Sequence, residues 1–251
     1  MQLLSQARAK HIRLLHQKKY REESATFLVE GEKAVVETLK SDWEVTLIAG
    51  TEKFQQTYIA LIDRAKDRFF RVGEDQLRQL STLQSNDSSL CIVQVPNAKP
   101  KPDPTASLWL AVEEIRDPGN LGTIIRLADW FGLSQLICIE NCVEWFNPKV
   151  VSSSMGSFLR VQPVFMTREE LILQKERVLV AAQMDGKSLY QFTFPAKATL
   201  IVGNESKGIS SFLLEKSSSI CIPRFGQAES LNAAMATGIL LNHWRFGLKI
   251  K

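Results

Sequence analysis

Residues 108–126 read LWLAVEEIRDPGNLGTIIR, and their pattern indicates the fold class of the larger part of the chain. Its first half is an apolar run, which is typical of a strand buried on both faces. Pro118 and Gly119 then set a turn, and Asn120 can cap a helix that follows it. A buried strand that passes through a polar loop into a helix indicates an α/β unit with a parallel sheet.

The same alternation continues in both directions along the chain. Downstream of residue 126 we expect strands at 135–140, 178–182, 198–203 and 218–222, and an amphipathic helix at about 230–247. Upstream we expect strands at 26–30, 45–49, 69–72 and 90–95, with helices at 3–19, 32–40 and 55–65. Strands that alternate with helices predict parallel sheets covered by helices.

A proline-rich segment separates the two parts of this pattern. Residues 96–107, PNAKPKPDPTAS, hold four of the nine prolines of the chain. Proline resists helix and central strand, so we interpret the segment as a semi-rigid linker. The sequence therefore predicts a first domain at 1–95, the linker at 96–107, and a second domain at 108–251.

The charge is mildly basic and unevenly placed. The 251 residues carry a formal net charge of +4, which is compatible with a polyanionic partner without requiring one. Residues 1–21 contain six Lys and Arg side chains and no acid. This stretch is either a solvated helix face or a surface that contacts nucleic-acid phosphate.

The cysteines and the hydropathy argue against a metal-binding protein and a membrane-spanning protein. Cys91, Cys138 and Cys221 lie in apolar runs, where a free thiol behaves as a small hydrophobe, and Cys142 has no second pair or nearby His to complete a zinc set. We therefore expect no metal. No apolar stretch approaches the length that spans a bilayer, so we expect a cytoplasmic, reduced protein without membrane contact.

Three loops at predicted strand ends are rich in the residues that bind ligands. They are residues 113–122, 202–208 and 222–232, and in parallel sheets ligands bind beyond the carboxyl ends of strands. Taken singly, each loop could hold ordinary helix caps and turn residues. No G-x-G-x-x-G, P-loop or G-x-S-x-G motif occurs, and three histidines make a Ser–His triad improbable.

Taken in order, the loops resemble the SpoU/TrmH family of RNA ribose 2'-O-methyltransferases, within the SPOUT superfamily. The matching motifs are DPGNLGTIIR at 117–126, VGNESKGIS at 202–210 and IPRFGQAESLNAAMATGI at 222–239, with a fourth patch, NPKVVSSSMGS, at 147–157. The first domain, through residues 19–39, resembles the L30e-like substrate-binding domain often fused ahead of the catalytic one. The resemblance implies a SPOUT α/β domain with a parallel sheet and a deep trefoil knot that clasps S-adenosylmethionine.

The resemblance also implies which residues form the site. Gly203, Ile222 and Leu231 match positions that contact the cofactor, and Asn204 lies beside them. The residues that match the catalytic set are Asn120, Arg126, Glu205, Ser230 and Asn232. The reaction transfers a methyl group from a sulfonium to a ribose 2'-hydroxyl. Arg126 is the family's proposed activator of that hydroxyl; alternatively, its guanidinium grips the substrate phosphate.

Spacing and resemblance together favour a homodimer. Asn120 and Arg126 are six residues apart, about 600° on a helix, so they lie on different faces and suit a site shared by two chains. The final helix carries an apolar stripe that is a candidate interface: Leu231, Met235, Ile239, Leu240, Trp244 and Leu248.

The chain departs from the family pattern at three positions, and the substrate stays open. Glu113 stands where Asp is frequent, Ser152 where Arg is common, and Arg224 where Met is frequent. A substrate-binding domain ahead of the catalytic one favours ribosomal RNA. The alternatives are transfer RNA as the substrate, or a non-catalytic RNA-binding or ribosome-assembly protein on the same fold.

Overall fold

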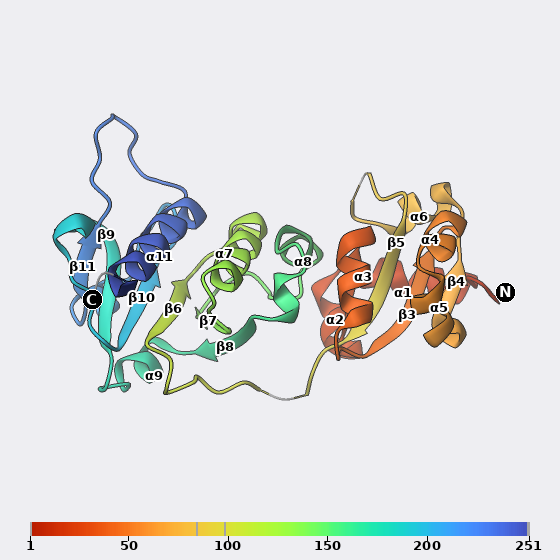
Figure 1. Cartoon of the computed structure of the whole chain (residues 1–251), viewed down its shortest axis with the longest axis horizontal. Coiled ribbons are helices and arrows are strands. Elements are labelled where there is room, and N and C mark those ends of the chain that lie inside the picture. The colour runs from red at the N-terminus through yellow and green to blue at the C-terminus, as the bar shows by residue number, and fades with distance from the viewer. Residues whose placement is uncertain (1, 84, 98, 250–251) are drawn as a thin grey trace. The chain divides into compact units, whose positions relative to one another are not determined.

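The computed structural model describes residues 2–83, 85–97 and 99–249, and it divides the chain into two compact units (Figure 1). The first unit consists of residues 1–98 together with 144–159, and the second of residues 99–143 together with 160–251. Each unit has its own sheet. In the described part of the chain, no helix combines the length and the apolar character needed to cross a membrane.

The first unit follows the predicted alternation with several differences. Its elements are β1 (Gln2–Leu3), α1 (Gln6–Leu14), α2 (Lys18–Ser24), β2 (Thr26–Glu30), α3 (Glu32–Lys40), β3 (Val45–Gly50), α4 (Glu52–Thr57), α5 (Ile59–Arg64), η1 (Lys66–Arg68), β4 (Phe69–Arg71), α6 (Glu74–Leu80), β5 (Ser89–Gln94), α8 (Pro148–Ser153) and η2 (Ser157–Leu159). The helix expected at 55–65 is interrupted at Tyr58, whose φ of −118° is not helical. Strand β1 and helix α6 were not expected.

The sheet of the first unit is mixed rather than parallel. Its strand order is β1-β4-β3-β5-β2, and β5 runs antiparallel to both β3 and β2. The expectation of a parallel sheet is therefore wrong for this unit. The apolar pattern of a buried strand does not encode its direction, which depends on where the preceding segment returns the chain to the sheet.

Helices cover both faces of this sheet. One face carries α1 and α6, with Ile12 and Leu77 in a fully buried apolar cluster. The other face carries α3, α4 and α5, and the segment 144–159 adds Val151 and Phe158 to the same cluster. The segment that contains the fourth patch, 147–157, thus belongs to the core of the first unit.

The basic N-terminal stretch forms two helices, whereas one was expected. The chain leaves the helical conformation at residues 15–17, where Leu15 is fully buried and its carbonyl accepts a hydrogen bond of 2.7 Å from Nη1 of Arg21. Arg21 is 3% exposed, and it pairs with Glu144. Nζ of Lys18 lies 3.5 Å from Oε1 of Glu22, one helical turn further along α2. Arg21 is therefore a buried structural residue, while Arg13 remains exposed.

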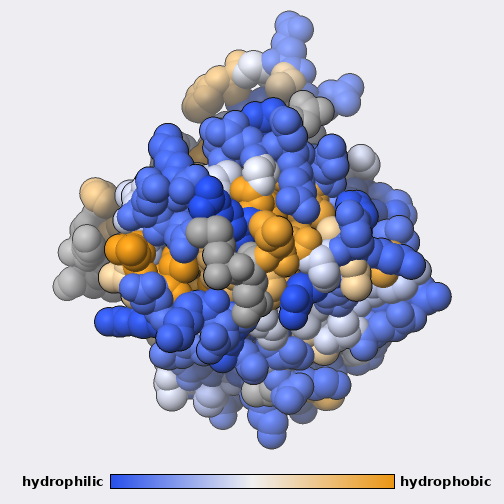
Figure 2. Space-filling view, turned by 90° about the vertical axis from the view of Figure 1, so that its right-hand side faces the viewer, coloured by the Kyte–Doolittle hydropathy of each residue, from blue (hydrophilic) through white to orange (hydrophobic). Residues whose placement is uncertain are grey.

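The surface of the first unit has an apolar patch bordered by hydrophilic residues (Figure 2). Large apolar side chains that the structure leaves exposed in the described part of this unit are Leu3, Ile59 and Met155. Leu3 belongs to β1, which is an edge strand of the sheet. The pocket described below is formed entirely by the second unit.

The second unit has the parallel sheet that the sequence predicts. Its elements are β6 (Leu108–Glu113), α7 (Pro118–Trp130), β7 (Gln135–Ile139), β8 (Gln162–Met166), α9 (Arg168–Ile172), β9 (Val178–Ser188), η3 (Leu189–Gln191), β10 (Ala198–Val202), α10 (Ser211–Leu214), β11 (Ser218–Cys221) and α11 (Ala233–Lys249). The strand order is β11-β9-β10-β6-β7-β8, and every pair is parallel. The predicted parallel sheet of this domain is confirmed.

Helices and long loops complete the second unit. Helix α11 packs against α7 (Figure 1). Residues of α9 and α10 close the apolar cluster on one side of the sheet through Leu171 and Leu213. The final helix begins at Ala233 instead of about residue 230, so Leu231 lies in the loop before it. Of the proposed stripe, Leu240 and Trp244 are buried and Met235 is exposed, whereas the side chain of Leu248 lies outside the described residues.

Candidate active site at the ends of β6, β10 and β11

The loop after β6 is anchored by buried charge. Glu113 is 1% exposed, and its carboxylate accepts hydrogen bonds from the guanidinium of Arg168 and from the backbone N–H of Ser210, the latter at 2.8 Å. The Glu113 carboxylate raises the pKa of Arg168. Nη1 of Arg168 also donates to Glu140 at 2.6 Å. A buried carboxylate is stable only when it is paired, and these contacts pair Glu113. They also join the end of β6 to Ser210 in the loop after β10 and, through Arg168, to Glu140 in the loop after β7.

The same loop delivers Asn120 to the edge of the sheet. Asp117 is the N-cap of α7, and its side chain accepts a hydrogen bond of 2.8 Å from the backbone of Asn120. Pro118 occupies the first helical turn, where its missing N–H costs nothing. Asn120 therefore lies in the first turn of α7, directly beyond the end of β6.

The loop after β10 folds back on itself at Gly203. Asn204 and Gly208 exchange two backbone hydrogen bonds of 2.9 and 3.1 Å, and a Cβ atom on Gly203 would lie 2.4 Å from the carbonyl carbon of Gly208. The side-chain oxygen of Asn204 accepts from the backbone N–H groups of Ser206 and Lys207, and its Nδ2 donates to the carbonyl of Glu114 at 3.0 Å. Only glycine fits at position 203, and Asn204 connects this loop to the one after β6.

The loop after β11 projects from the sheet before the chain enters α11 (Figure 1). It ends at Asn232, whose side-chain oxygen accepts hydrogen bonds from the backbone N–H groups of Ala234 and Met235 at 3.0 and 3.2 Å. Asn232 thereby caps the N-terminus of α11. A capping asparagine keeps its Nδ2 free to donate elsewhere.

A chain of hydrogen bonds joins one polar residue from each of the three loops. Nδ2 of Asn232 donates to Oδ1 of Asn120 at 2.8 Å, and Nδ2 of Asn120 donates to Oε1 of Glu205 at 2.5 Å. These residues are far apart in the sequence, so the tertiary fold is what brings them together. Their side chains are oriented by one another, which leaves Oε2 of Glu205 without a hydrogen-bond partner among the described residues.

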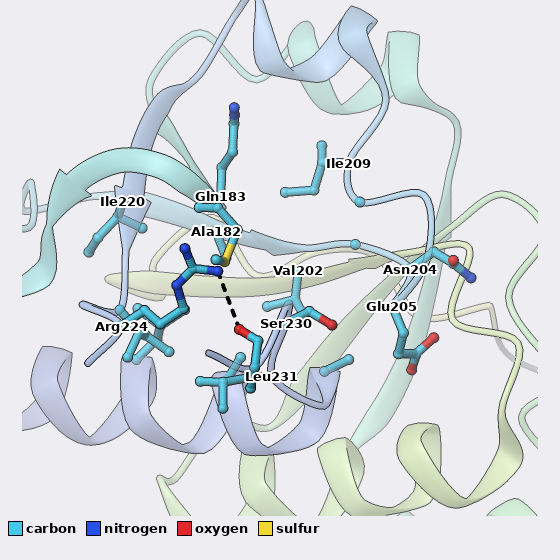
Figure 3. A pocket seen from close by; sticks show the side chains of 18 of the residues that line it. Ala182, Gln183, Val202, Asn204, Glu205, Ile209, Ile220, Arg224, Ser230 and Leu231 are labelled. Carbon is cyan, nitrogen blue, oxygen red and sulfur yellow. Dashed lines mark hydrogen bonds between the residues drawn. The ribbon is translucent and has the colours of Figure 1, made fainter. Parts of the chain in front are cut away.

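A pocket of about 630 Å³ lies beside this chain of hydrogen bonds, within the size range of small-molecule sites (Figure 3). Its wall includes all four residues predicted to bind the cofactor, Gly203, Asn204, Ile222 and Leu231, together with the predicted catalytic residues Glu205 and Ser230. Apolar side chains and loop backbone form most of the wall. Asn120 and Asn232 do not line the pocket, but they reach it through Glu205.

Arg126 is the predicted site residue that the structure does not bring to the others. It is exposed on α7, it does not line the pocket, and it lies six residues beyond Asn120. Six residues correspond to about 600° of helical rotation, so the two side chains leave α7 in different directions. Within a single chain, Arg126 is apart from the Asn120–Glu205–Asn232 group.

The structure also places residues at the site that the sequence analysis missed or left unassigned. The first are Ala182, Gln183 and Met184 of β9, which line the pocket because β9 continues to Ser188 instead of ending near residue 182. Arg224 lines the pocket as well. Arg168 was not expected, since the only sequence signal is a capping box, in which Thr167 and Glu170 begin a short helix.

Comparisons with known proteins agree with this geometry. The SpoU rRNA Methylase family matches residues 107–242, and an MRM3-like substrate binding domain matches residues 6–90. The 23S rRNA (guanosine(2553)-2'-O)-methyltransferase RlmP of Bacillus subtilis is 33% identical over 92% of this chain and 93% of its own length. The 23S rRNA (uridine(2479)-2'-O)-methyltransferase of Streptomyces viridochromogenes is 26% identical over 91% of this chain and 85% of its own length.

A solved structure extends the comparison to the cofactor. The AdoMet-bound rRNA methyltransferase from Sinorhizobium meliloti superposes with a TM-score of 0.86 at 27% identity, covering 99% of this chain and 97% of the other. AdoMet is S-adenosylmethionine, and a pocket of suitable size lies at the loops that the sequence assigned to it.

Fold, site and relatives together define a methyltransferase that takes its methyl group from S-adenosylmethionine and acts on the ribose 2'-hydroxyl of RNA. The chain belongs to the SpoU rRNA Methylase family, with an MRM3-like substrate binding domain ahead of the methylase domain. The predicted family, α/β fold class, reaction and cofactor are confirmed. The roles of the individual site residues remain predictions.

Proposed function

We propose that this chain methylates a ribose 2'-hydroxyl of ribosomal RNA, using the Asn120–Glu205–Asn232 group as its catalytic centre. The observation that carries the proposal is the chain of hydrogen bonds from Asn232 through Asn120 to Glu205, beside a pocket suited to a nucleoside-sized cofactor. The choice of ribosomal RNA is supported by the relatives from Bacillus subtilis and Streptomyces viridochromogenes, which are named as 23S rRNA 2'-O-methyltransferases.

The cofactor is held by loop backbone and apolar side chains. Gly203 allows the start of the loop after β10 to pass close to the backbone of Gly208, and Asn204 fixes the turn that follows. Ile222 and Leu231 contribute apolar surface to the wall of the pocket. When bound, S-adenosylmethionine supplies an electrophilic methyl group on a sulfonium cation. We also assign to the loops after β10 and β11 the trefoil knot that the family resemblance implies.

The polar group orients the ribose and accepts its proton. A 2'-hydroxyl is a very weak acid, so catalysis depends on alignment of the oxygen and on acceptors for its hydrogen. Oε2 of Glu205 is available to accept a hydrogen bond from this hydroxyl, since Oε1 is already bound by Asn120. Ser230, exposed in the wall of the pocket, contributes a further hydroxyl that contacts the ribose. Asn232 holds Asn120 in place.

Arg126 completes the site from a second subunit. It is exposed and lies away from Asn120 on the same helix, so in a homodimer the guanidinium of Arg126 of the partner subunit binds the substrate phosphate beside the 2'-hydroxyl. Exposed apolar residues on α7 and α11 support this assembly: Trp130 is 82% exposed and Met235 63%.

The first domain, residues 1–95, binds the RNA. It precedes the linker at 96–107 and the methylase domain at 108–251. Support comes from the MRM3-like substrate binding domain that matches residues 6–90. A cytoplasmic location belongs to the proposal as well, and its support is that Cys91, Cys138, Cys142 and Cys221 are all free thiols, as is usual in a reducing compartment.

The test is the methylated product. The purified protein is incubated with radiolabelled S-adenosylmethionine and ribosomal RNA that lacks 2'-O-methyl groups, and the RNA is digested to nucleosides. We expect a ribose-methylated nucleoside with wild type and a loss of at least about a hundredfold in rate with Glu205→Gln, the lower end of what a general base contributes. The matched control is Glu229→Gln, an exposed acid in the neighbouring loop. A methylated base as the product, or full activity of Glu205→Gln, would contradict the proposal.

A further inference from the structure

The pocket wall carries a cation whose hydrogen-bonding capacity is mostly unused. Arg224 lies in the loop after β11, lines the pocket and is exposed to solvent. Its Nη1 donates to the carbonyl of Ala228 at 3.4 Å, close to the outer limit of a hydrogen bond. No ion pair of Arg224 is found among the described residues. A guanidinium has five N–H donors, so most of them remain available to a ligand.

Among the described residues, the pocket wall carries three charged side chains, and two of them face each other across it. Of the described lining residues, Glu205 is the carboxylate, and Lys207 and Arg224 are the cations. Figure 3 shows Glu205 and Arg224 on opposite sides of the pocket, with Val202 and Leu231 between them. Lys207 lies two residues from Glu205 in the same loop. Arg224 is thus the cation that faces Glu205 across the pocket, whereas Lys207 belongs to the same loop as Glu205.

This arrangement matches the charges of the cofactor. S-adenosylmethionine has a sulfonium cation and an α-ammonium group, and one anion, the α-carboxylate of its methionine part. We propose that Arg224 binds this α-carboxylate and makes the pocket select S-adenosylmethionine over analogues that lack a carboxylate. The inference rests on the cofactor assignment above and extends it to a residue outside the predicted set.

The physical basis is a charge-assisted pair at a partly apolar wall. The planar fork of a guanidinium matches the two oxygens of a carboxylate, and it is more weakly hydrated than an ammonium group. Ile222 and Leu231 belong to the same loop as Arg224 and line the same wall, and apolar neighbours reduce the screening that weakens exposed ion pairs. The hydrogen bond to Ala228 spans residues four apart in the loop and leaves the other N–H donors of Arg224 to a ligand.

Calorimetry with matched ligands tests the proposal. The ligands are S-adenosylmethionine, S-adenosylhomocysteine, decarboxylated S-adenosylmethionine and 5'-methylthioadenosine, of which the first two carry the carboxylate. For Arg224→Met we expect affinity for the first two to fall about 10- to 100-fold, the range of a lost charge-assisted hydrogen bond. Affinity for the other two stays within about twofold, because the lost interaction involves the carboxylate alone.

Two further variants make the assignment specific. Arg224→Lys should recover part of the affinity for the carboxylate ligands, because a point charge remains while the fork is lost. Lys207→Met removes the other cation of the wall and should bind all four ligands as wild type does.

Other results would overturn the proposal. Equal weakening of all four ligands by Arg224→Met would mean that Arg224 shapes the loop, and selective weakening by Lys207→Met would assign the carboxylate to Lys207. A loss confined to RNA affinity would assign Arg224 to RNA phosphate. If wild type bound none of the four ligands, the cofactor assignment itself would fail; normal binding without discrimination would overturn the role of Arg224 alone.

Discussion

Gly203 lies where the chain leaves β10 and passes against the backbone of Gly208. A Cβ atom there would be 2.4 Å from the carbonyl carbon and oxygen of Gly208 and 2.6 Å from the nitrogen of Ile209. These are backbone atoms held by the Asn204–Gly208 hydrogen bonds, so they cannot yield as a flexible side chain would. The requirement for glycine is steric and comes from the close approach of two parts of one loop.

Gly203→Ala should therefore damage the pocket. We expect the free energy of unfolding to fall by about 1–3 kcal/mol, the usual range for overpacking a tight site, and cofactor affinity to fall at least about tenfold as the loop shifts. Thermal unfolding and calorimetry with S-adenosylhomocysteine measure the two effects. The matched control is Gly226→Ala, where a Cβ atom meets nothing within 4 Å. Similar behaviour of the two variants would contradict the steric argument.

In the two N-terminal helices, the role of each basic residue depends on whether the fold buries or exposes it. The six basic residues of 1–21 look equivalent in the sequence. In the structure, Arg21 is buried against Glu144, whereas Arg13 on α1 is exposed and Lys18 at the start of α2 is exposed beside Glu22. The exposed residues are thus the ones available to RNA phosphate.

Reversing Arg13 and Lys18 to Glu together should weaken RNA binding and reduce its salt dependence. Each lost phosphate contact lowers the slope of log K against log salt by roughly 1. Binding titrations at several salt concentrations measure the slope, and cofactor affinity should not change. The control reverses Arg64 and Lys66, two exposed cations of the same unit at α5 and η1. An equal effect of both reversals would indicate only a change in net charge.

At the level of the whole molecule, the assembly of two subunits determines whether Arg126 can reach the Asn120–Glu205–Asn232 group. The described contacts connect Asn120, Glu205 and Asn232 within one chain, and Arg126 is outside this group. If the site is completed across a twofold axis, two inactive variants can repair each other. A dimer of one Arg126→Ala chain and one Glu205→Gln chain contains one complete site, formed by Glu205 of the first and Arg126 of the second.

Co-expression of these two variants should restore activity that neither has alone. Random pairing makes half of the dimers mixed, each with one working site of two, so we expect about a quarter of wild-type activity per chain. Sedimentation establishes the dimer, and the methylation assay measures the recovery. A double variant, Arg126→Ala with Glu205→Gln on one chain, mixed with an Arg126→Ala chain is the control and should stay inactive. No recovery in the first mixture would place Arg126 in its own subunit's site or outside catalysis.

Most of the strands and the family are readable from the sequence alone. Apolar runs such as 108–113 and 198–202 form strands that are buried on both faces. Their conformation is therefore predictable from the local sequence. Glycine, proline and asparagine at the loops carry their turn chemistry with them. Motif order then identified the methylase domain, and every predicted cofactor residue lies in the wall of one pocket.

Features that depend on contacts between distant segments follow only from the folded chain. The direction of β5, the burial of Arg21 and the placement of residues 144–159 in the first unit depend on contacts between parts of the chain far apart in sequence. The same holds for the hydrogen bonds that join Asn120 to Glu205 and Asn232. A local pattern encodes the conformation and burial of a segment, but the partner of a charge or an amide is chosen by packing, which the whole chain forms together.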